Sequence, residues 1–348
     1  MHIRFSKFKY PYLIAEISSN HLGIISNAKR LIFNAKKYGA SAVKLQTFTP
    51  ETMTINSNKK EFLIEDKIFN SKNLWQLYKV AQTPFSWHKE LFSYAKSLGI
   101  LCFSTPFDET SVDLLENLNC PFYKIASPEI LHFPLINKIA KTKKSLIIST
   151  GMANLNEIDK AYSYARNKGI KDIALLYCVS NYPAEISDFN INNIKILKKE
   201  FKCKIGFSDH SLNNKIVEAA VFAGAEIIEK HIALDIKKKS LDSKFSLKGK
   251  AIMTYKKTID DAYKLLGKNF FYRSNKEKKN IRFRRSIYAI KNIKKGEKIT
   301  LNNIKSIRPG LGISPIYFDR LLNKISPFKI KAETPIKKNI LNKLKINL

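Results

Sequence analysis

Short apolar runs alternate with longer amphipathic segments over the first three quarters of the chain. The runs are rich in β-branched residues, which is typical of buried strands in repeated strand–helix units. The segments between them have helical spacing, since Ala28, Leu31, Ile32 and Ala35 follow the i, i+3, i+4, i+7 pattern of one buried face. Eight strands are predicted in this way, over residues 11–18, 41–47, 100–106, 121–127, 145–151, 173–180, 203–210 and 226–234.

Eight strand–helix units in about 265 residues, ending with a helix near 253–266, indicate the fold class. They predict an α/β protein built as a (β/α)8 TIM barrel rather than as an open sheet. The segment from residue 49 to residue 86 is too long for an ordinary loop of such a barrel and contains Trp75 and Tyr78. Because long loops in compact domains are usually functional, we expect this segment to lie over the barrel mouth.

The pattern changes after Gly267. A charged stretch follows, and beyond it apolar and polar residues alternate around a "KKGE" turn, as in a small β-rich module. We therefore expect three parts: a catalytic barrel over residues 1–267, a linker over 268–283 and a small β-domain over 284–348.

Composition places the chain among large globular proteins, since 44% of its 348 residues are hydrophobic. It contains neither a window of about eighteen apolar residues nor a signal peptide, so we expect a cytoplasmic protein with no membrane partner. Its cysteines form no CxxC pair, which favours buried, reduced thiols over disulfides or a structural zinc site. They are Cys102, Cys120, Cys178 and Cys203.

The net charge of +33, from 62 Lys and Arg against 29 Asp and Glu, first suggests a polyanion partner. The excess is mostly lysine and is accompanied by abundant Ile and Asn, and no nucleic-acid-binding motif is present, so we expect no nucleic-acid partner. Residues 264–348 nevertheless carry 23 basic and 4 acidic residues, a surplus of 19. This leaves a remote alternative, a non-catalytic protein that binds an anionic polymer.

The ends of the predicted strands are unusually polar. In a TIM barrel the chemistry sits at the carboxyl ends of the strands, so these residues are candidates for one site. Two lysines and several hydroxyls directed into one mouth are suited to a dianion such as a phosphate ester. The strand-end residues are Glu16, Ser18, Asn20, His21, Lys44, Gln46, Ser104, Thr105, Lys124, Ser127, Glu129, Ser149, Thr150, Gly151, Ser180, Tyr182, Ser208, Asp209, His210, Glu229 and His231.

His210 and His231 end the seventh and eighth predicted strands, which are neighbours in a barrel. Their imidazoles can reach a common ion, with Glu16 or Asp209 as possible oxygen partners. Two histidines with several open positions suit an octahedral Mn²⁺ or Mg²⁺ ion better than a closed zinc site. The residues therefore predict a metal-assisted reaction on a phosphorylated small molecule, with Glu16 and Glu129 available for acid–base or charge-stabilising roles.

Seven ordered motifs resemble the phosphoenolpyruvate-condensing sialic acid synthase family. They are "AEISSNHLG", "AVKLQT", "YKIASPE", "ISTGM", "CVSNYP", "GFSDHS" and "EKHIAL", and "RPGLGIS" resembles the antifreeze-like (SAF) domain. The resemblance covers nearly the whole chain and implies a TIM barrel followed by a C-terminal β-clip domain.

Within that family, "TPFSWHKELFSYAKSLG" and "LDSKFSL" resemble the branch that forms pseudaminate. The resemblance implies a transferase that condenses phosphoenolpyruvate with the open-chain acetamido sugar 2,4-diacetamido-2,4,6-trideoxy-L-altrose and water, releasing phosphate. Synthesis of N-acetylneuraminate or legionaminate by the same chemistry is the alternative.

The resemblance also implies roles for the strand-end residues. Glu129 would stabilise the cationic carbon, Glu16 would act on the attacking water or a sugar hydroxyl, and Asp242 would act beside the sugar. His210 and His231 would hold Mn²⁺ or Mg²⁺, and Arg308 would reach the sugar from the SAF domain of a partner subunit in a domain-swapped homodimer. Phosphoenolpyruvate would contact Lys44, Lys124, Ser127, Ser149, Ser180 and Ser208, and the sugar would contact Gln46, Tyr182, Asp242 and Arg308.

Two departures from the family pattern concern the sugar. Leu22 stands where the family commonly has a polar Asn, and the loop before Asp242 lacks both an Arg at Ile236 and the expected glycines. Any residue there that needs a positive φ would be strained without glycine.

Overall fold

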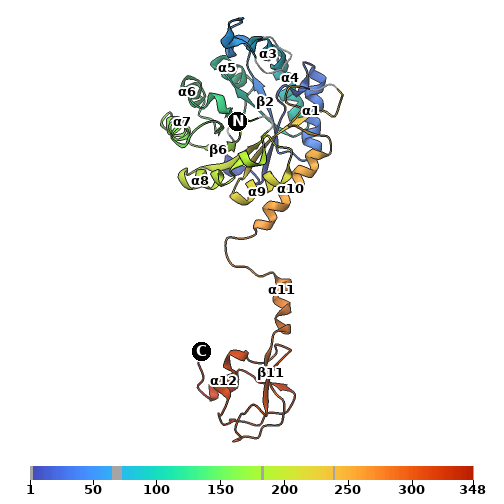
Figure 1. Cartoon of the computed structure of the whole chain (residues 1–348), viewed down its shortest axis with the longest axis vertical. Coiled ribbons are helices and arrows are strands. Elements are labelled where there is room, and N and C mark those ends of the chain that lie inside the picture. The colour runs from blue at the N-terminus through green and yellow to red at the C-terminus, as the bar shows by residue number, and fades with distance from the viewer. Residues whose placement is uncertain (1–2, 65–72, 182–183, 238–239, 348) are drawn as a thin grey trace. The chain divides into compact units, whose positions relative to one another are not determined.

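The computed structural model describes residues 3–64, 73–181, 184–237 and 240–347. The chain forms two compact units, Met1–Gly267 and Lys268–Leu348 (Figure 1). No helix among the described residues is both long enough and apolar enough to cross a bilayer.

The first unit is a closed barrel of eight parallel strands, which confirms the predicted TIM barrel. Each strand pairs with the next in sequence, and β8 pairs with β1, with Glu16 opposite His231. A two-residue strand, β9 (Leu247–Lys248), pairs with the end of β8. The barrel strands are β1 (Tyr12–Glu16), β2 (Ala42–Thr47), β3 (Leu101–Pro106), β4 (Tyr123–Ile125), β5 (Leu146–Ser149), β6 (Ile173–Cys178), β7 (Lys204–Asp209) and β8 (Ile227–Ala233).

Helices surround this barrel (Figure 1). The predicted face of α1 is buried, with Ala28, Leu31, Ile32 and Ala35 at most 1% exposed. The last helix of the unit, α10, begins two residues before its predicted start. The helices of the unit are α1 (Ile25–Lys37), α2 (Pro50–Met53), α3 (Leu74–Ala81), α4 (Phe85–Ser97), α5 (Glu109–Asn117), α6 (Phe133–Lys141), α7 (Leu155–Asn167), α8 (Asn192–Glu200), α9 (Asn214–Ala223) and α10 (Ala251–Leu266).

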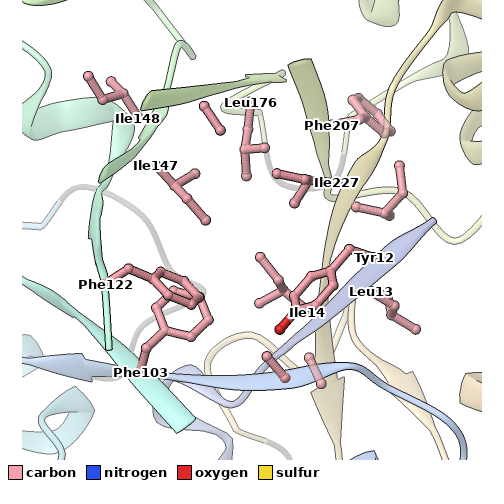
Figure 2. Close-up of a cluster of buried hydrophobic side chains, with 14 of the residues drawn as sticks. Tyr12, Leu13, Ile14, Phe103, Phe122, Ile147, Ile148, Leu176, Phe207 and Ile227 are labelled. Atoms are coloured by element: carbon pink, nitrogen blue, oxygen red, sulfur yellow. The ribbon is translucent and has the colours of Figure 1, made fainter. Parts of the chain in front are cut away.

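Large apolar side chains fill the barrel interior (Figure 2). Phe103 and Phe122 pack with ring centroids 4.3 Å apart, and Phe5 from the N-terminal segment packs edge-on against Phe122. Gly206 on β7 provides room, because a Cβ there would lie 2.2 Å from the carbonyl oxygen of Ile227. This dense core fixes the strands that carry the site.

The second unit has a three-stranded antiparallel sheet and its own apolar core, as the alternation after residue 284 predicted. The strand β10 (Ser286–Ala289) lies between β11 (Ile304–Ile307) and β12 (Thr334–Pro335). Fully buried isoleucines such as Ile287 and Ile299 form the core. The helices are α11 (Asn275–Lys279), which lies in the expected linker, α12 (Phe318–Leu321) and α13 (Asn339–Lys343).

Candidate active site

A cavity of about 580 Å³ opens at the carboxyl ends of the barrel strands. It brings together most of the residues singled out from the sequence. Glu16 lies fully buried beneath it, Tyr182 lies outside the described residues, and Arg308 is an exposed residue of the second unit. The strand-end residues Ser18 and Glu229 line the cavity. So do the residues with a predicted role Lys44, Gln46, Lys124, Ser127, Glu129, Ser149, Ser180, Ser208, His210, His231 and Asp242.

The floor of the cavity is a buried network of two lysines and two carboxylates. Lys44 Nζ lies 2.5 Å from Glu16 Oε2 and 3.3 Å from Glu229 Oε1, and Lys124 Nζ lies 3.0 Å from Glu229 Oε2. The hydroxyl of Ser208 donates to Glu229 Oε1 over 3.3 Å. Glu229 was recognised from the sequence only as a polar strand end, although it lies two residues before His231 and therefore on the same face of β8.

The pKa values of the two carboxylates of this floor are shifted in opposite directions. Burial raises the pKa of Glu16 to about 7, although Lys44 opposes the shift. The ammonium groups of Lys124 and Lys44 outweigh the effect of burial on Glu229 and hold its pKa well below its ordinary range. Glu229 therefore remains ionised and holds both lysines at the cavity. Burial lowers the pKa of Lys124, and Glu229 opposes that shift, whereas Glu16 and Glu229 together raise the pKa of Lys44.

Small polar groups line the cavity beside the lysines. The backbone N–H of Gly151 donates to Ser127 Oγ over 3.0 Å, and Ser127 Oγ lies 3.1 Å from Cys178 Sγ. Cys178 was expected only as a buried thiol, but it also lines the cavity together with Ser180. We call Ser127, Gly151, Cys178 and Ser180 the phosphate cradle. Serine hydroxyls near two ammonium groups are suited to binding a phosphate ester.

We expect the substitution Gly151→Ala to fill this cradle. The new Cβ would lie 2.2 Å from Ser180 Oγ, 2.7 Å from Cys178 Sγ and 2.8 Å from Ser127 Oγ, so all three groups would have to move. The KM for the phosphate ester that the family resemblance implies, phosphoenolpyruvate, should rise by at least about tenfold, in keeping with the loss of one or more charge-assisted hydrogen bonds. Steady-state kinetics, with the exposed neighbour Met152→Ala as control, measures the effect; an unchanged KM would mean that the anion binds elsewhere.

His210 and His231 face each other across the cavity edge, with ring centroids 5.4 Å apart. His210 Nδ1 lies 2.9 Å from the carbonyl oxygen of Val179, so Nδ1 carries the proton and Nε2 holds the lone pair. His231 Nδ1 is buried without a hydrogen-bond partner among the described residues. Burial lowers the pKa of His210 to about 4 and that of His231 well below its ordinary value, so both rings are neutral.

Neutral, oriented imidazoles with a buried nitrogen that lacks a partner fit a divalent cation. The described residues contain no group of three or more His, Cys, Asp or Glu side chains arranged for a metal. Asp209, predicted as a possible oxygen partner of the ion, does not lie beside the two histidines in the cavity lining. It points to the opposite side of β7, because side chains alternate along a strand, and there accepts hydrogen bonds from Tyr255 and Ser211.

Asp242 lies at the end of the loop that departs from the family pattern. It accepts a hydrogen bond from Ser18, and its Oδ2 lies 3.8 Å from His231 Nδ1. None of the described residues of this loop, 236–237 and 240–242, has a positive φ, so the expected strain is not found there. Leu22, by contrast, has φ of 58° in the left-handed region, which asparagine tolerates better than leucine.

Glu129 ends a 3-10 turn, Ser127–Glu129, at the cavity edge. Burial raises its pKa from 4.5 to about 7, and its Oε2 has no hydrogen-bond partner among the described residues. Such a carboxylate is poorly stabilised by its surroundings, which suits a group that interacts with positive charge developing during a reaction.

The substitution Glu129→Gln is expected to stabilise the fold at neutral and alkaline pH and to have little effect near pH 5. Because the folded-state pKa is raised, the folded protein binds a proton that the unfolded chain has released, and stability decreases as pH rises from 4.5 towards about 7. The variant should therefore melt about 2 °C above the parent near pH 8 and at nearly the same temperature near pH 5. Calorimetry at both pH values tests this, and an equal shift at both would contradict a charge penalty.

Comparisons with known proteins agree with this geometry. A sequence profile of the NeuB family matches residues 31–270, and a SAF domain profile matches residues 284–341. Pseudaminic acid synthase of Campylobacter jejuni is 39% identical over 96% of this chain and 97% of its own, and N,N'-diacetyllegionaminic acid synthase of the same bacterium is 37% identical over 94% and 99%. The crystal structure of an N-acetylneuraminic acid synthetase from Leptospira borgpetersenii superposes with a TM-score of 0.71 at 30% identity, over 81% of this chain and 95% of that one.

These matches define the class of protein, a NeuB-type barrel with a polar mouth followed by a SAF domain. The chain belongs to the NeuB family.

Proposed function

We propose that the protein is a phosphoenolpyruvate-dependent nonulosonate synthase of the pseudaminate branch. It condenses phosphoenolpyruvate with 2,4-diacetamido-2,4,6-trideoxy-L-altrose and water to give pseudaminate and inorganic phosphate. The observation that carries this proposal is one cavity that holds both a lysine–hydroxyl cradle for a phosphate ester and a neutral histidine pair. Similarity to pseudaminic acid synthase over nearly the full length supports the choice of branch.

In this proposal the lysine floor binds the first substrate. Lys44 and Lys124 face the charged groups of phosphoenolpyruvate, and Ser127, Ser149, Ser180 and Ser208 donate hydrogen bonds to its oxygens. Glu229 holds the lysines in place before the substrate arrives and opposes the lowering of the Lys124 pKa by burial.

The second substrate lies beside the histidines, with Gln46, Asp242 and Tyr182 as its contacts. His210 and His231 would hold Mn²⁺ or Mg²⁺, which when bound supplies a Lewis acid for the aldehyde oxygen. The methylene carbon of phosphoenolpyruvate forms a bond to the aldehyde carbon, and positive charge develops at the neighbouring carbon. Glu129, half-buried at the cavity edge, stabilises that charge.

Water completes the reaction. Glu16, whose pKa of about 7 suits proton transfer near neutral pH, positions or deprotonates the water or a sugar hydroxyl. Water adds to the cationic carbon, and phosphate then leaves with cleavage of the carbon–oxygen bond.

The same proposal includes an assembly. Arg308, exposed in the second unit, would contact the sugar in the barrel of a partner subunit, which gives a domain-swapped homodimer. We place the reaction in the cytoplasm, where phosphoenolpyruvate is formed.

Phosphate release tests the proposed substrate. Purified protein with phosphoenolpyruvate and Mn²⁺ should release phosphate with the altrose sugar and much less with the sugar precursors of legionaminate and N-acetylneuraminate. A preference for either of those two sugars would place the protein in another branch of the family.

A further inference from the structure

One wall of the cavity is apolar. We define the apolar wall as Phe48, Met53, Leu77, Tyr78, Ala81 and Phe107, which follow β2 and β3 and include residues of α2 and α3. In a closed barrel of eight strands, β2 lies opposite β6, so this wall faces the Cys178 and Ser180 side of the phosphate cradle. The two halves of the cavity therefore differ in chemistry.

The apolar wall is firmly built. Phe48 is 2% exposed and packs edge-on against Tyr78 and Phe107, with ring centroids 5.9 and 5.2 Å away. The buried Asn73 caps α3 through the backbone N–H of Gln76. Because this wall is already ordered, it can bind a substrate without a further loss of conformational entropy.

The segment that carries the wall is also attached to the barrel at its far end. Thr83 Oγ1 lies 3.3 Å from His21 Nε2, and His88 Nε2 lies 2.8 Å from Thr47 Oγ1, all within buried surroundings. These contacts fasten to the barrel the chain that directly follows α3, and residues of α3 line the same cavity as Gln46 near the end of β2.

From this arrangement we infer that the apolar wall binds the far end of the open-chain sugar, its C6 methyl group and the methyl group of its C4 acetamide. The inference rests on the proposed function. The polar half of the cavity is needed by phosphoenolpyruvate and the aldehyde end of the sugar, which leaves the two methyl groups to the other half. The wall thus acts as a specificity element for 6-deoxy sugars.

The size of the effect follows from the chemistry of the wall. A hydroxyl on C6 would lose its water against the side chains of Leu77, which offers no hydrogen-bond partner, and Met53, whose sulfur is only a weak acceptor. An apolar pocket discriminates against an added hydroxyl by about 10- to 100-fold in kcat/KM. We expect a preference in this range for the 6-deoxy sugar.

The test compares the 6-deoxy substrate with its 6-hydroxy counterpart, 2,4-diacetamido-2,4-dideoxy-L-altrose, by phosphate release. Leu77→Asn, which preserves size but adds polarity, should reduce the preference at least fivefold, mainly by slowing the 6-deoxy substrate. Met53→Gln tests the wall independently, in case the first variant does not fold. Val80→Asn lies on the same helix but is 63% exposed outside the cavity lining, so it should keep the wild-type ratio.

The outcomes separate the inference from the proposed function. Turnover of the 6-deoxy sugar with a ratio unchanged in both wall variants, or with no preference in the parent protein, overturns the inference alone. A parent protein that releases no phosphate with either altrose sugar overturns the proposed function and the inference with it.

Discussion

The substitution His210→Ala lowers turnover to below about one-thousandth of the parent value, a loss of several kcal/mol of transition-state stabilisation. Among the described residues, the side chain supplies one of the two imidazoles that line the cavity, and no cluster of other His, Cys, Asp or Glu residues there could replace it. Its ring lies at the surface of the cavity and not within the barrel core, so the variant should fold normally. Phosphate release and circular dichroism measure the two effects.

Metal removal gives the matching control. Chelation should abolish turnover of the parent protein, and Mn²⁺ or Mg²⁺ should restore it, whereas neither ion should restore the variant. His132→Ala, at the start of α6 and outside the cavity lining, should have no effect. Activity of His210→Ala near that of the parent with added Mn²⁺ would show that the histidines do not hold the ion.

The second large effect is expected for Lys124→Met, which keeps the length of the side chain but removes its charge. Phosphoenolpyruvate loses a buried cation, and kcat/KM for it should decrease about 10²- to 10³-fold. The variant also leaves Glu229 with Lys44 as its remaining lysine partner, so some stability is lost as well.

A double variant separates the two consequences. Lys124→Met/Glu229→Gln removes the buried charge imbalance and should recover thermal stability without recovering activity. Lys138→Met, which removes an exposed ion pair with Asp113, serves as the control for loss of a lysine. Unchanged phosphate release in Lys124→Met, together with salt-sensitive binding of an anionic polymer, would instead support the non-catalytic alternative.

Periodicity was sufficient to predict the barrel. Each of the eight apolar runs overlaps one of the eight barrel strands, because a strand of a parallel barrel is buried on both faces and contrasts with its polar ends. The run at 121–127 was predicted too long, since only Tyr123–Ile125 forms a strand before Pro128 stands in a 3-10 turn.

Which residues face the cavity could be predicted wherever the alternation of side chains along a single strand decides it. Ser208 and His210 share a face of β7 and line the cavity, and the same alternation directs Asp209 away from it. The alternation rule applied to β8 would also have selected Glu229 with His231. The proposal of Asp209 as a metal partner overlooked this rule.

Contacts between distant segments could not be predicted. The bond between Thr47 and His88 joins residues 41 positions apart, and the one between Ser18 and Asp242 spans 224 positions. The length of the insertion from residue 49 indicated a covering segment, but only the folded chain reveals that its inner surface is apolar.

The fate of the bridging oxygen of phosphoenolpyruvate tests the central proposal most directly. Phosphoenolpyruvate labelled with ¹⁸O between carbon and phosphorus is incubated with the altrose sugar and Mn²⁺, and both products are analysed by mass spectrometry. Carbon–oxygen cleavage predicts labelled phosphate and an unlabelled nine-carbon acid. Label retained in the acid, or phosphate released without that acid, would contradict the account.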